Sequence, residues 1–273
     1  MARSAAQPMM ENLFDIVHED GDLLVINKPA GLVCHPTKGD VYSSLISRVR
    51  LHLGGSRSAE HPLGASQPTL MAEQELGAPL VEPQLINRLD RETSGVILVA
   101  KNPTTARAWR RRWESGAVEK LYLAIVRGHP RDERGRIDAP LGKDERSAVA
   151  IKDTVRPDGA AAATEFRVLR RFTRAEGDFS LLEVRLLTGR KHQIRIHLAH
   201  LGHPLVGDKL YGGDEGLYLD FVFGRLTDAQ RRALLVPHQA LHARSLGWGE
   251  GAEQRRFEAE PEDWFTAFVA GGS

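Results

Sequence analysis

Six short apolar runs constrain the fold of this chain more than any other feature. Each is rich in Val, Ile or Leu, and each ends at Gly, Pro or polar residues. Runs of this length are typical of buried strands rather than of helices. The fourth and fifth lie close enough in sequence to predict a hairpin. The runs cover residues 22–29, 95–100, 121–126, 163–169, 179–187 and 240–246.

A helix is predicted between the second and third runs. Asn102 is a favoured cap residue, Pro103 suits the first helical position, and Gly116 suits the position past the end. Trp109 and Trp113 lie about one turn apart. They are therefore expected to face the core while the arginines of the same helix face water.

Two further helices are predicted towards the C-terminus. Residues 188–189 are expected to cap a helix that runs from about Arg190 to Leu201, with Gly202 past its end, and another covers residues 261–269. Strands outnumber helices and do not alternate with them as βαβ units. The predicted fold class is therefore α+β.

One domain is expected, with two segments outside its regular pattern. Residues 1–10 are predicted to be a flexible tail and residues 11–273 a single domain. Residues 54–83 lack a steady apolar period and are predicted to form an insertion loop. The chain has a single cysteine, no secretory signal and no apolar run long enough to cross a bilayer, so a cytoplasmic location is expected.

The charges are balanced overall but unevenly distributed. Lys+Arg 37 against Asp+Glu 36 gives a formal net charge of +1, which by itself predicts no polyanionic partner. Residues 101–127 are locally basic, since only Glu114 and Glu119 oppose their cations. The cations of this basic patch are Lys101, Arg107, Arg110, Arg111, Arg112, Lys120 and Arg127.

Residues 87–95, Asn-Arg-Leu-Asp-Arg-Glu-Thr-Ser-Gly, place a carboxylate between two arginines just before a buried strand. Arg88 and Arg91 are expected to lower the pKa of Asp90, because an opposite charge nearby favours the ionised form. An ionised carboxylate can act as a nucleophile. On spacing alone, a solvated salt-bridge cluster is the alternative interpretation.

Residues 188–197, Thr-Gly-Arg-Lys-His-Gln-Ile-Arg-Ile-His, gather cations at a predicted helix start. Unpaired backbone N–H groups there also favour anions, so Arg190 and Lys191 are candidates for binding RNA phosphates. His192 and Arg195 are three residues apart and are expected to share one helix face. The residues expected on the buried face are Ile194, Leu198 and Leu201.

Three segments resemble signatures of the RluA-like family of RNA pseudouridine synthases. Residues 87–101 resemble the family motif built around His-Arg-Leu-Asp, a Thr-Ser-Gly turn and an apolar strand. Residues 120–122, Lys-Leu-Tyr, resemble its Lys-x-Tyr element, and residues 188–197 resemble its second signature. Residues 202–212 are similar to the loop after that signature, and the resemblance runs from about residue 22 to residue 246.

The resemblance implies a site and a reaction. Asp90 corresponds to the catalytic aspartate, Arg195 to the arginine that pairs with it, and Tyr122 to a tyrosine that stacks on the base and is a candidate for proton transfer. Arg88 is expected to help displace the target uridine from its stack. Asn87 stands where the family commonly has His, and we expect this departure to tune the activity rather than abolish it.

The resemblance also implies a fold and partners. We expect a mixed, largely antiparallel sheet flanked by helices and loops, with a central RNA-binding cleft. The expected substrate is ribosomal RNA or tRNA, and the enzyme is expected to act as a monomer without cofactor or metal. Some relatives carry an N-terminal S4 domain, but here the catalytic pattern begins by about residue 14, so none is expected.

Other functions are less compatible with the sequence. Four histidines crowd residues 192–203, but no zinc-ligand spacing accompanies them. P-loop, Rossmann and Gly-x-Ser-x-Gly motifs are absent from the sequence. Two alternatives stay open: an RNA-binding protein of the same fold without catalysis, and a glycoside hydrolase that uses Asp90 and Glu92.

Overall fold

The structure is a computed structural model, and it describes residues 14–36, 44–55, 82–249 and 254–272. The predicted tail at residues 1–10 and residues 56–81 of the predicted insertion lie outside the described residues. Within the described ranges, every helix is too short or too polar to span a lipid bilayer.

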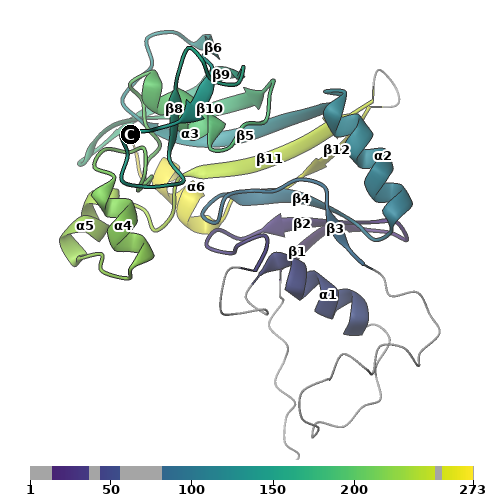
Figure 1. The fold of residues 1–273 in the computed structure, drawn as a ribbon. Coiled ribbons are helices and arrows are strands. Elements are labelled where there is room, and N and C mark those ends of the chain that lie inside the picture. Colours follow the sequence, from purple (N-terminus) through teal and green to yellow (C-terminus); the bar gives the residue numbers. More distant parts are fainter. Residues whose placement is uncertain (1–13, 37–43, 56–81, 250–253, 273) are drawn as a thin grey trace, which may run out of the picture.

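One ten-stranded sheet forms the centre of the fold (Figure 1). All six predicted runs are strands of this sheet, and the predicted hairpin is present as β9 and β10. Its strands are antiparallel to their neighbours, apart from the parallel pair β4 and β11, which confirms the predicted fold class. The main order is β1 (Asp15–Glu19), β2 (Leu23–Lys28), β4 (Ser94–Ala100), β11 (Leu241–Trp248), β5 (Val118–Arg127), β10 (Gly177–Leu186), β9 (Ala163–Arg174) and β6 (Arg134–Asp138).

Four short strands complete the β-structure. β3 (Gln84–Leu85) pairs with β4, and β12 (Arg255–Glu258) pairs with β11. β7 (Leu141–Lys143) and β8 (Asp153–Val155) form a separate two-stranded sheet beside α3. None of these four strands is predicted from the sequence.

In the part of the chain that the structure describes, six helices lie around the main sheet (Figure 1). α3 and α6 lie on opposite faces of β5, because Ala124 and Val126 pack with α3 residues while Leu123 and Ile125 pack with α6 residues. The helices are α1 (Leu45–Gly55), α2 (Pro103–Glu114), α3 (Gln193–His200), α4 (Gly216–Val222), α5 (Asp228–Leu234) and α6 (Asp263–Ala270).

Helix α2 confirms its prediction from local chemistry. Asn102 Oδ1 accepts a hydrogen bond from the Thr105 amide at 2.9 Å, and Gly116 past the end has φ +75°. Trp109 is buried and Trp113 is partly buried, while the arginines of this helix are exposed. The apolar face of α2 thus covers β4.

Helix α3 begins later than predicted. The Arg190 amide and the Thr188 hydroxyl both donate to Gln193 Oε1, and the Gln193 amide donates to the Arg190 carbonyl at 3.2 Å, so a side chain and one backbone bond close a turn before the helix begins. His192 then takes a left-handed conformation with φ 54°, and the helix starts after it. Residues 190–192 are therefore not helical, which corrects the predicted start.

The buried face of α3 is only partly as predicted. Ile194 and Leu198 are buried, but Leu201 is 40% exposed because it lies past the last helical residue. Gly202 follows with φ +87°, as expected for the residue that ends a helix.

Gly95 allows β4 and β11 to approach each other. Its φ is +113°, and a Cβ atom placed there would lie 2.2 Å from the Ala243 carbonyl oxygen. Glycine is required both by the conformation and by the space. This contact brings β11 beside the chain segment that carries Asp90.

Candidate active site

Asn87 attaches the segment before Asp90 to strand β4. The Asn87 side chain is buried, donates from Nδ2 to the Val96 carbonyl at 3.0 Å and accepts at Oδ1 from the Leu98 amide at 2.8 Å. These bonds lie on one edge of β4, between the residues that pair with β3 and the residues that pair with β11, which begin at Ser94. The residue that departs from the family motif therefore supports the backbone beside the site.

The turn after Asp90 is fixed by contacts across the sheet. The Thr93 amide donates to the Asp90 carbonyl, and Thr93 Oγ accepts from Gln239 Nε2 at 2.7 Å. His242 Nε2 faces the Ala259 carbonyl at 2.9 Å, and a carbonyl can only accept, so this nitrogen carries the proton. His242 Nδ1 then accepts from the Ser94 hydroxyl at 2.9 Å.

Arg195 brings the two sequence signatures together. Its Nη1 donates to Asp90 Oδ2 at 2.9 Å, the contact expected from the family resemblance. Its other face holds a second carboxylate, since Nε and Nη2 donate to Asp208 at 2.7 and 2.9 Å. Both Arg195 and Asp208 are buried, whereas the Asp90 side chain is 30% exposed. Asp90 is thus the member of this triad that a substrate can reach.

The charge that keeps Asp90 ionised comes from a distant part of the chain. Burial acts to raise the pKa of Asp90, but the Arg195 guanidinium outweighs it and holds that pKa below its usual value. Arg91 faces elsewhere, because its Nε donates to the Gly31 carbonyl and its guanidinium lies over the Phe221 ring. The expectation that Arg91 lowers the pKa of Asp90 is therefore wrong.

His192 presents a neutral imidazole to Asp90. Its Nε2 lies 3.9 Å from Asp90 Oδ1, and burial lowers the pKa of His192. Its Nδ1 lies 3.0 Å from the Tyr211 hydroxyl, which itself accepts from the Asp153 amide. Burial raises the pKa of Tyr211, so that phenol keeps its proton and can donate it to Nδ1. This arrangement favours the tautomer whose Nε2–H faces the carboxylate.

Tyr122 lines the same hollow as Asp90. Burial and the Asp90 charge both raise the pKa of Tyr122, so it stays a neutral phenol at physiological pH. Among the described residues its hydroxyl has no hydrogen-bond partner, which leaves it available to a ligand. The ring packs against the apolar cluster beneath α3.

The hollow in front of Asp90 has a volume of about 90 Å³. Arg88, which is exposed, and Arg190 both line it, so two of the three predicted RNA-binding residues lie at its rim. Lys191 is not part of its lining and forms an ion pair with Asp153 at 3.0 Å. The other lining residues are Leu89, Thr93, Tyr122, Leu186, His192, Gln193, Ile194, Arg195 and Leu241.

Glu92 does not form a carboxylate pair with Asp90 in this hollow. It is buried and accepts a hydrogen bond from Lys209 Nζ at 2.6 Å, with His238 Nδ1 at 3.4 Å. It is not among the residues that line the Asp90 hollow. This placement argues against a glycoside hydrolase that uses both carboxylates.

Sequence reasoning missed Asp208, although residues 202–212 resemble a family loop. The available signal was a carboxylate directly after a glycine in that loop, and in the structure this glycine, Gly207, has φ +75°. Its two oxygens hold Arg195, so it acts on the site through that residue.

In the described part of the chain, no three His, Cys, Asp or Glu side chains group in a way that could hold a metal ion.

Comparison with known proteins agrees with the geometry. A family model described as RNA pseudouridylate synthase matches residues 22–200. The uncharacterized RNA pseudouridine synthase YlyB of Bacillus subtilis is 34% identical over 94% of this chain and 72% of its own length. Ribosomal large subunit pseudouridine synthase D of Zymomonas mobilis is 34% identical over 93% of this chain and 71% of that protein. An uncharacterized RNA pseudouridine synthase of Chloroflexus aurantiacus is 39% identical, and the chain spans only 57% of its length.

The fold is also found in a solved structure. Human RNA Pseudouridylate Synthase Domain Containing 1 superposes with a TM-score of 0.68 over 98% of this chain and 91% of its own, at 24% identity. That likeness concerns the fold, whereas the sequence matches concern the family. On these matches, the chain belongs to the RluA family of RNA pseudouridine synthases.

Proposed function

We propose that this chain isomerises uridines in structured RNA to pseudouridine with Asp90 as the reacting carboxylate. The observation that carries the proposal is the Asp90–Arg195 pair at 2.9 Å, where the carboxylate is both ionised and partly exposed in a hollow lined by Tyr122. An ionised carboxylate is the form that can attack an electrophilic carbon.

The RNA side of the proposal rests on the rim of the hollow. Arg88 and Arg190 line it and are exposed, so they are placed to meet the RNA. The target uridine would leave its stack, which costs a few kcal/mol and least in loops, and Arg88 would take its place. RNA binding should weaken with added salt, because phosphates are neutralised by cations.

The reaction requires the uracil to be detached, turned and rejoined. The N1–C1′ bond breaks, the uracil stays in the hollow, and C5 bonds to C1′ with loss of the C5 hydrogen. Asp90 can add to the uracil ring, attack C1′ or assist an elimination, and all three routes give this outcome. Tyr122 is a neutral phenol, so its proposed roles are stacking on the base and proton transfer rather than action as a phenolate.

Tritium release from RNA labelled at uridine C5 tests the reaction. Wild-type protein should release tritium from transcripts of the host's ribosomal RNA or tRNA, and Asp90→Asn should release none while it still binds the RNA. Asp158→Asn is the matched control, since Asp158 pairs with Arg156 on the surface. Release by Asp90→Asn contradicts the role of Asp90, and RNA binding without release by the wild type supports the non-catalytic alternative.

We also propose large-subunit ribosomal RNA as the first substrate to test, with tRNA second. The support is the printed name of the Zymomonas mobilis relative, of which this chain covers 71%. Pseudouridine mapping in cells that lack the gene would identify the modified RNA and position.

We further propose that the protein is cytoplasmic, because a single buried cysteine fits a reducing compartment. We also propose that it is a monomer. Light scattering in solution tests the monomer, and fractionation tests the location.

A further inference from the structure

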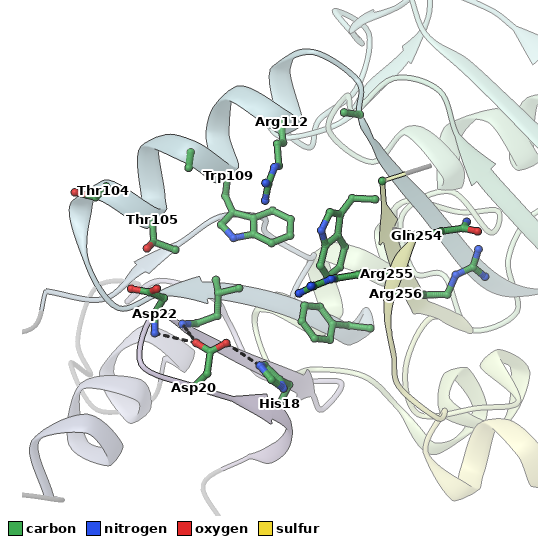
Figure 2. A pocket seen from close by; sticks show the side chains of 16 residues that line it. His18, Asp20, Asp22, Thr104, Thr105, Trp109, Arg112, Gln254, Arg255 and Arg256 are labelled. Atoms are coloured by element: carbon green, nitrogen blue, oxygen red, sulfur yellow. Dashed lines mark hydrogen bonds and ion pairs between the residues drawn. The ribbon is translucent and has the colours of Figure 1, made fainter. Parts of the chain in front are cut away.

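A second, larger hollow lies at the end of β11 away from Asp90, and Figure 2 shows the side chains that line it. It has a volume of about 1300 Å³ and is bounded by α2, the turn between β1 and β2, and the adjoining ends of β11 and β12. Nothing in the proposed reaction uses it. Its side chains combine aromatic rings, which can stack on a flat ligand, with arginines, which can bind an anion.

Three aromatic rings form one wall of this hollow. The ring centroids of Trp109 and Trp248 are 4.9 Å apart at 76°, and those of Trp248 and Phe257 are 4.9 Å apart at 43°. Trp109 is buried, but Trp248 and Phe257 are only half-buried. Phe257 is stacked on the His18 ring, with centroids 5.2 Å apart at 30°, so Trp248 is the ring that keeps surface on which a flat ligand can stack.

Two arginines beside these rings have no carboxylate partner. Arg112 lies over the Trp109 ring at 5.2 Å, and Figure 2 shows Arg255 reaching across from β12 on the other side. Among the described residues, neither is within ion-pair distance of an acidic side chain. Arg256 differs, because it forms an ion pair with Glu119 at 2.8 Å. Two exposed guanidinium groups are thus available to an anion.

Two acidic residues, Asp20 and Asp22, line the same hollow from the turn between β1 and β2. Asp20 accepts from the Asp22 and Leu23 amides and pairs with His18, while Asp22 accepts from Asn102 Nδ2. Their oxygens are engaged, but their charge repels an anion from that turn. A bound phosphate is therefore directed towards Arg112 and Arg255.

An intermediate hollow lies between this hollow and the Asp90 site. It has a volume of about 340 Å³, shares Ala117, Trp248, Gly249 and Gln254 with the large one, and shares Leu186 with the Asp90 hollow. The distance between the two hollows follows from the length of β11, since Leu241 lines the Asp90 hollow and Trp248 lines the large one. At about 3.3 Å per residue this is roughly 20 Å, a distance that a few nucleotides can span.

We propose that the hollow lined by Trp248, Phe257, Arg112 and Arg255 is an accessory site for a single-stranded stretch of the same RNA that enters the Asp90 hollow. A base stacks on the exposed part of Trp248, and phosphates meet the two free arginines. This pairing of stacking platforms with cations is how proteins hold single-stranded nucleic acid without reading its sequence. The proposal rests on the proposed function for its choice of ligand.

RNA length provides the test. Binding is measured with uridine-containing single strands of about 20 and about 2 nucleotides, because the shorter strand cannot reach from one hollow to the other. Arg112→Glu and Arg255→Glu should each weaken binding of the long RNA roughly tenfold and reduce its salt dependence. Binding of the short RNA should change by less than about twofold, because the Asp90 hollow is untouched. Trp248→Ala should weaken the long RNA to a similar extent.

Arg131→Glu is the matched control. Arg131 is exposed and precedes β6, at the opposite edge of the sheet, and the substitution makes the same charge change. The proposal is overturned if Arg112→Glu and Arg255→Glu bind the long RNA like wild type or like Arg131→Glu, as expected if a peptide or a second copy occupies the hollow. It is also overturned if both RNA lengths lose the same factor. Because both arginines are exposed, misfolding does not complicate these two variants.

Failure of this proposal can be separated from failure of the proposed function. If only the accessory site is wrong, both arginine variants release tritium with unchanged KM for long RNA. If the reaction is wrong, wild-type protein releases none, yet the length dependence of binding is still measurable.

Discussion

Asp208 holds Arg195 with both carboxylate oxygens, at 2.7 Å from Nε and 2.9 Å from Nη2. Asp208 is in turn fixed by the amides of Leu210 and Tyr211. A planar guanidinium gripped on two nitrogens has little freedom, so the remaining Nη1 is aimed at Asp90 before RNA arrives. The Asp90 carboxylate thus owes its position to a loop more than one hundred residues away in sequence.

Asp208→Asn should therefore destabilise the protein and slow the reaction together. The substitution leaves a buried arginine with only Asp90 as a charged partner, a change that costs about 3–5 kcal/mol. For a chain of this size we expect Tm to fall by roughly 10 °C. Tritium release at saturating RNA should also fall, because Arg195 loses its fixed orientation.

Asp158→Asn serves as the control for Asp208→Asn. Asp158 pairs with Arg156 at 2.6 Å, but on the surface, so its loss should leave Tm and activity unchanged. Thermal unfolding of both variants makes the comparison. Equal Tm values for Asp208→Asn and the wild type would contradict the orienting role of Asp208.

The lowered pKa of Asp90 predicts a particular dependence on acid. A carboxylate whose pKa is depressed on folding contributes stability that is present above the unfolded value and is lost as pH falls through the folded pKa. The reference value for Asp90 is 3.8, and its pKa in the fold lies below that. The stability difference between wild type and Asp90→Asn should therefore be constant above about pH 5 and change only at lower pH.

Urea unfolding of the two proteins over this range checks the acid prediction. Activity should depend on the same ionisation of Asp90. The loss of activity that is due to protonation of Asp90 should therefore occur below pH 3.8. A stability difference that already changes between about pH 6 and 5 would show that the folded pKa is raised rather than lowered.

Features with a local physical cause could be predicted from the sequence. The apolar runs became strands because alternation and length distinguish buried strands from helices. Helix α2 was predictable because Asn102, Pro103 and Gly116 each act within a few residues of themselves. The three carried-over site residues, Asp90, Tyr122 and Arg195, lie around one hollow, as the family resemblance of their motifs implies.

Features set by distant contacts could not be predicted. Arg91 is adjacent to Asp90 in sequence, yet its side chain bonds to Gly31, and the cation beside Asp90 comes from α3. The start of α3 depends on the Gln193 side chain closing the preceding turn, which competes with helical backbone bonding. Short edge strands such as β12 carry too few apolar residues to give a period.

Gly95→Ala should be far more disruptive than a glycine substitution elsewhere. A methyl group there would lie 2.2 Å from the Ala243 carbonyl oxygen, so β4 and β11 would have to separate. Because this contact also joins the Asp90 segment to the sheet, we expect a loss of more than about 4 kcal/mol, seen as insoluble or unfolded protein.

Gly116→Ala separates strain from steric overlap. Gly116 also has a positive φ, +75°, but nothing lies within 4 Å of its added Cβ. Only the cost of a left-handed alanine applies, about 1–2 kcal/mol. Equal stability of the two variants in urea unfolding would contradict the close approach of β4 and β11.

Lys28 provides the last prediction, because it is a fully buried lysine beneath the Asp90 segment. Its Nζ donates to the carbonyls of Pro29, Leu32 and Arg91 at 2.8, 2.9 and 3.2 Å. It therefore ties the turn after β2 to the residue that follows Asp90. Lys28→Met removes the donor from three carbonyls, which should cost on the order of 3 kcal/mol at neutral pH.

The pH dependence of that cost has a definite sign. Burial lowers the pKa of Lys28 from 10.5 to about 8, so between these values the unfolded chain binds a proton that the folded chain does not. Stability then rises with pH relative to a variant without this group, by at most about 1.4 kcal/mol per pH unit. The gap between wild type and Lys28→Met should widen from about pH 8 to pH 10 in urea unfolding. A gap that narrows with rising pH would mean that the carbonyls raise the pKa of Lys28 more than burial lowers it.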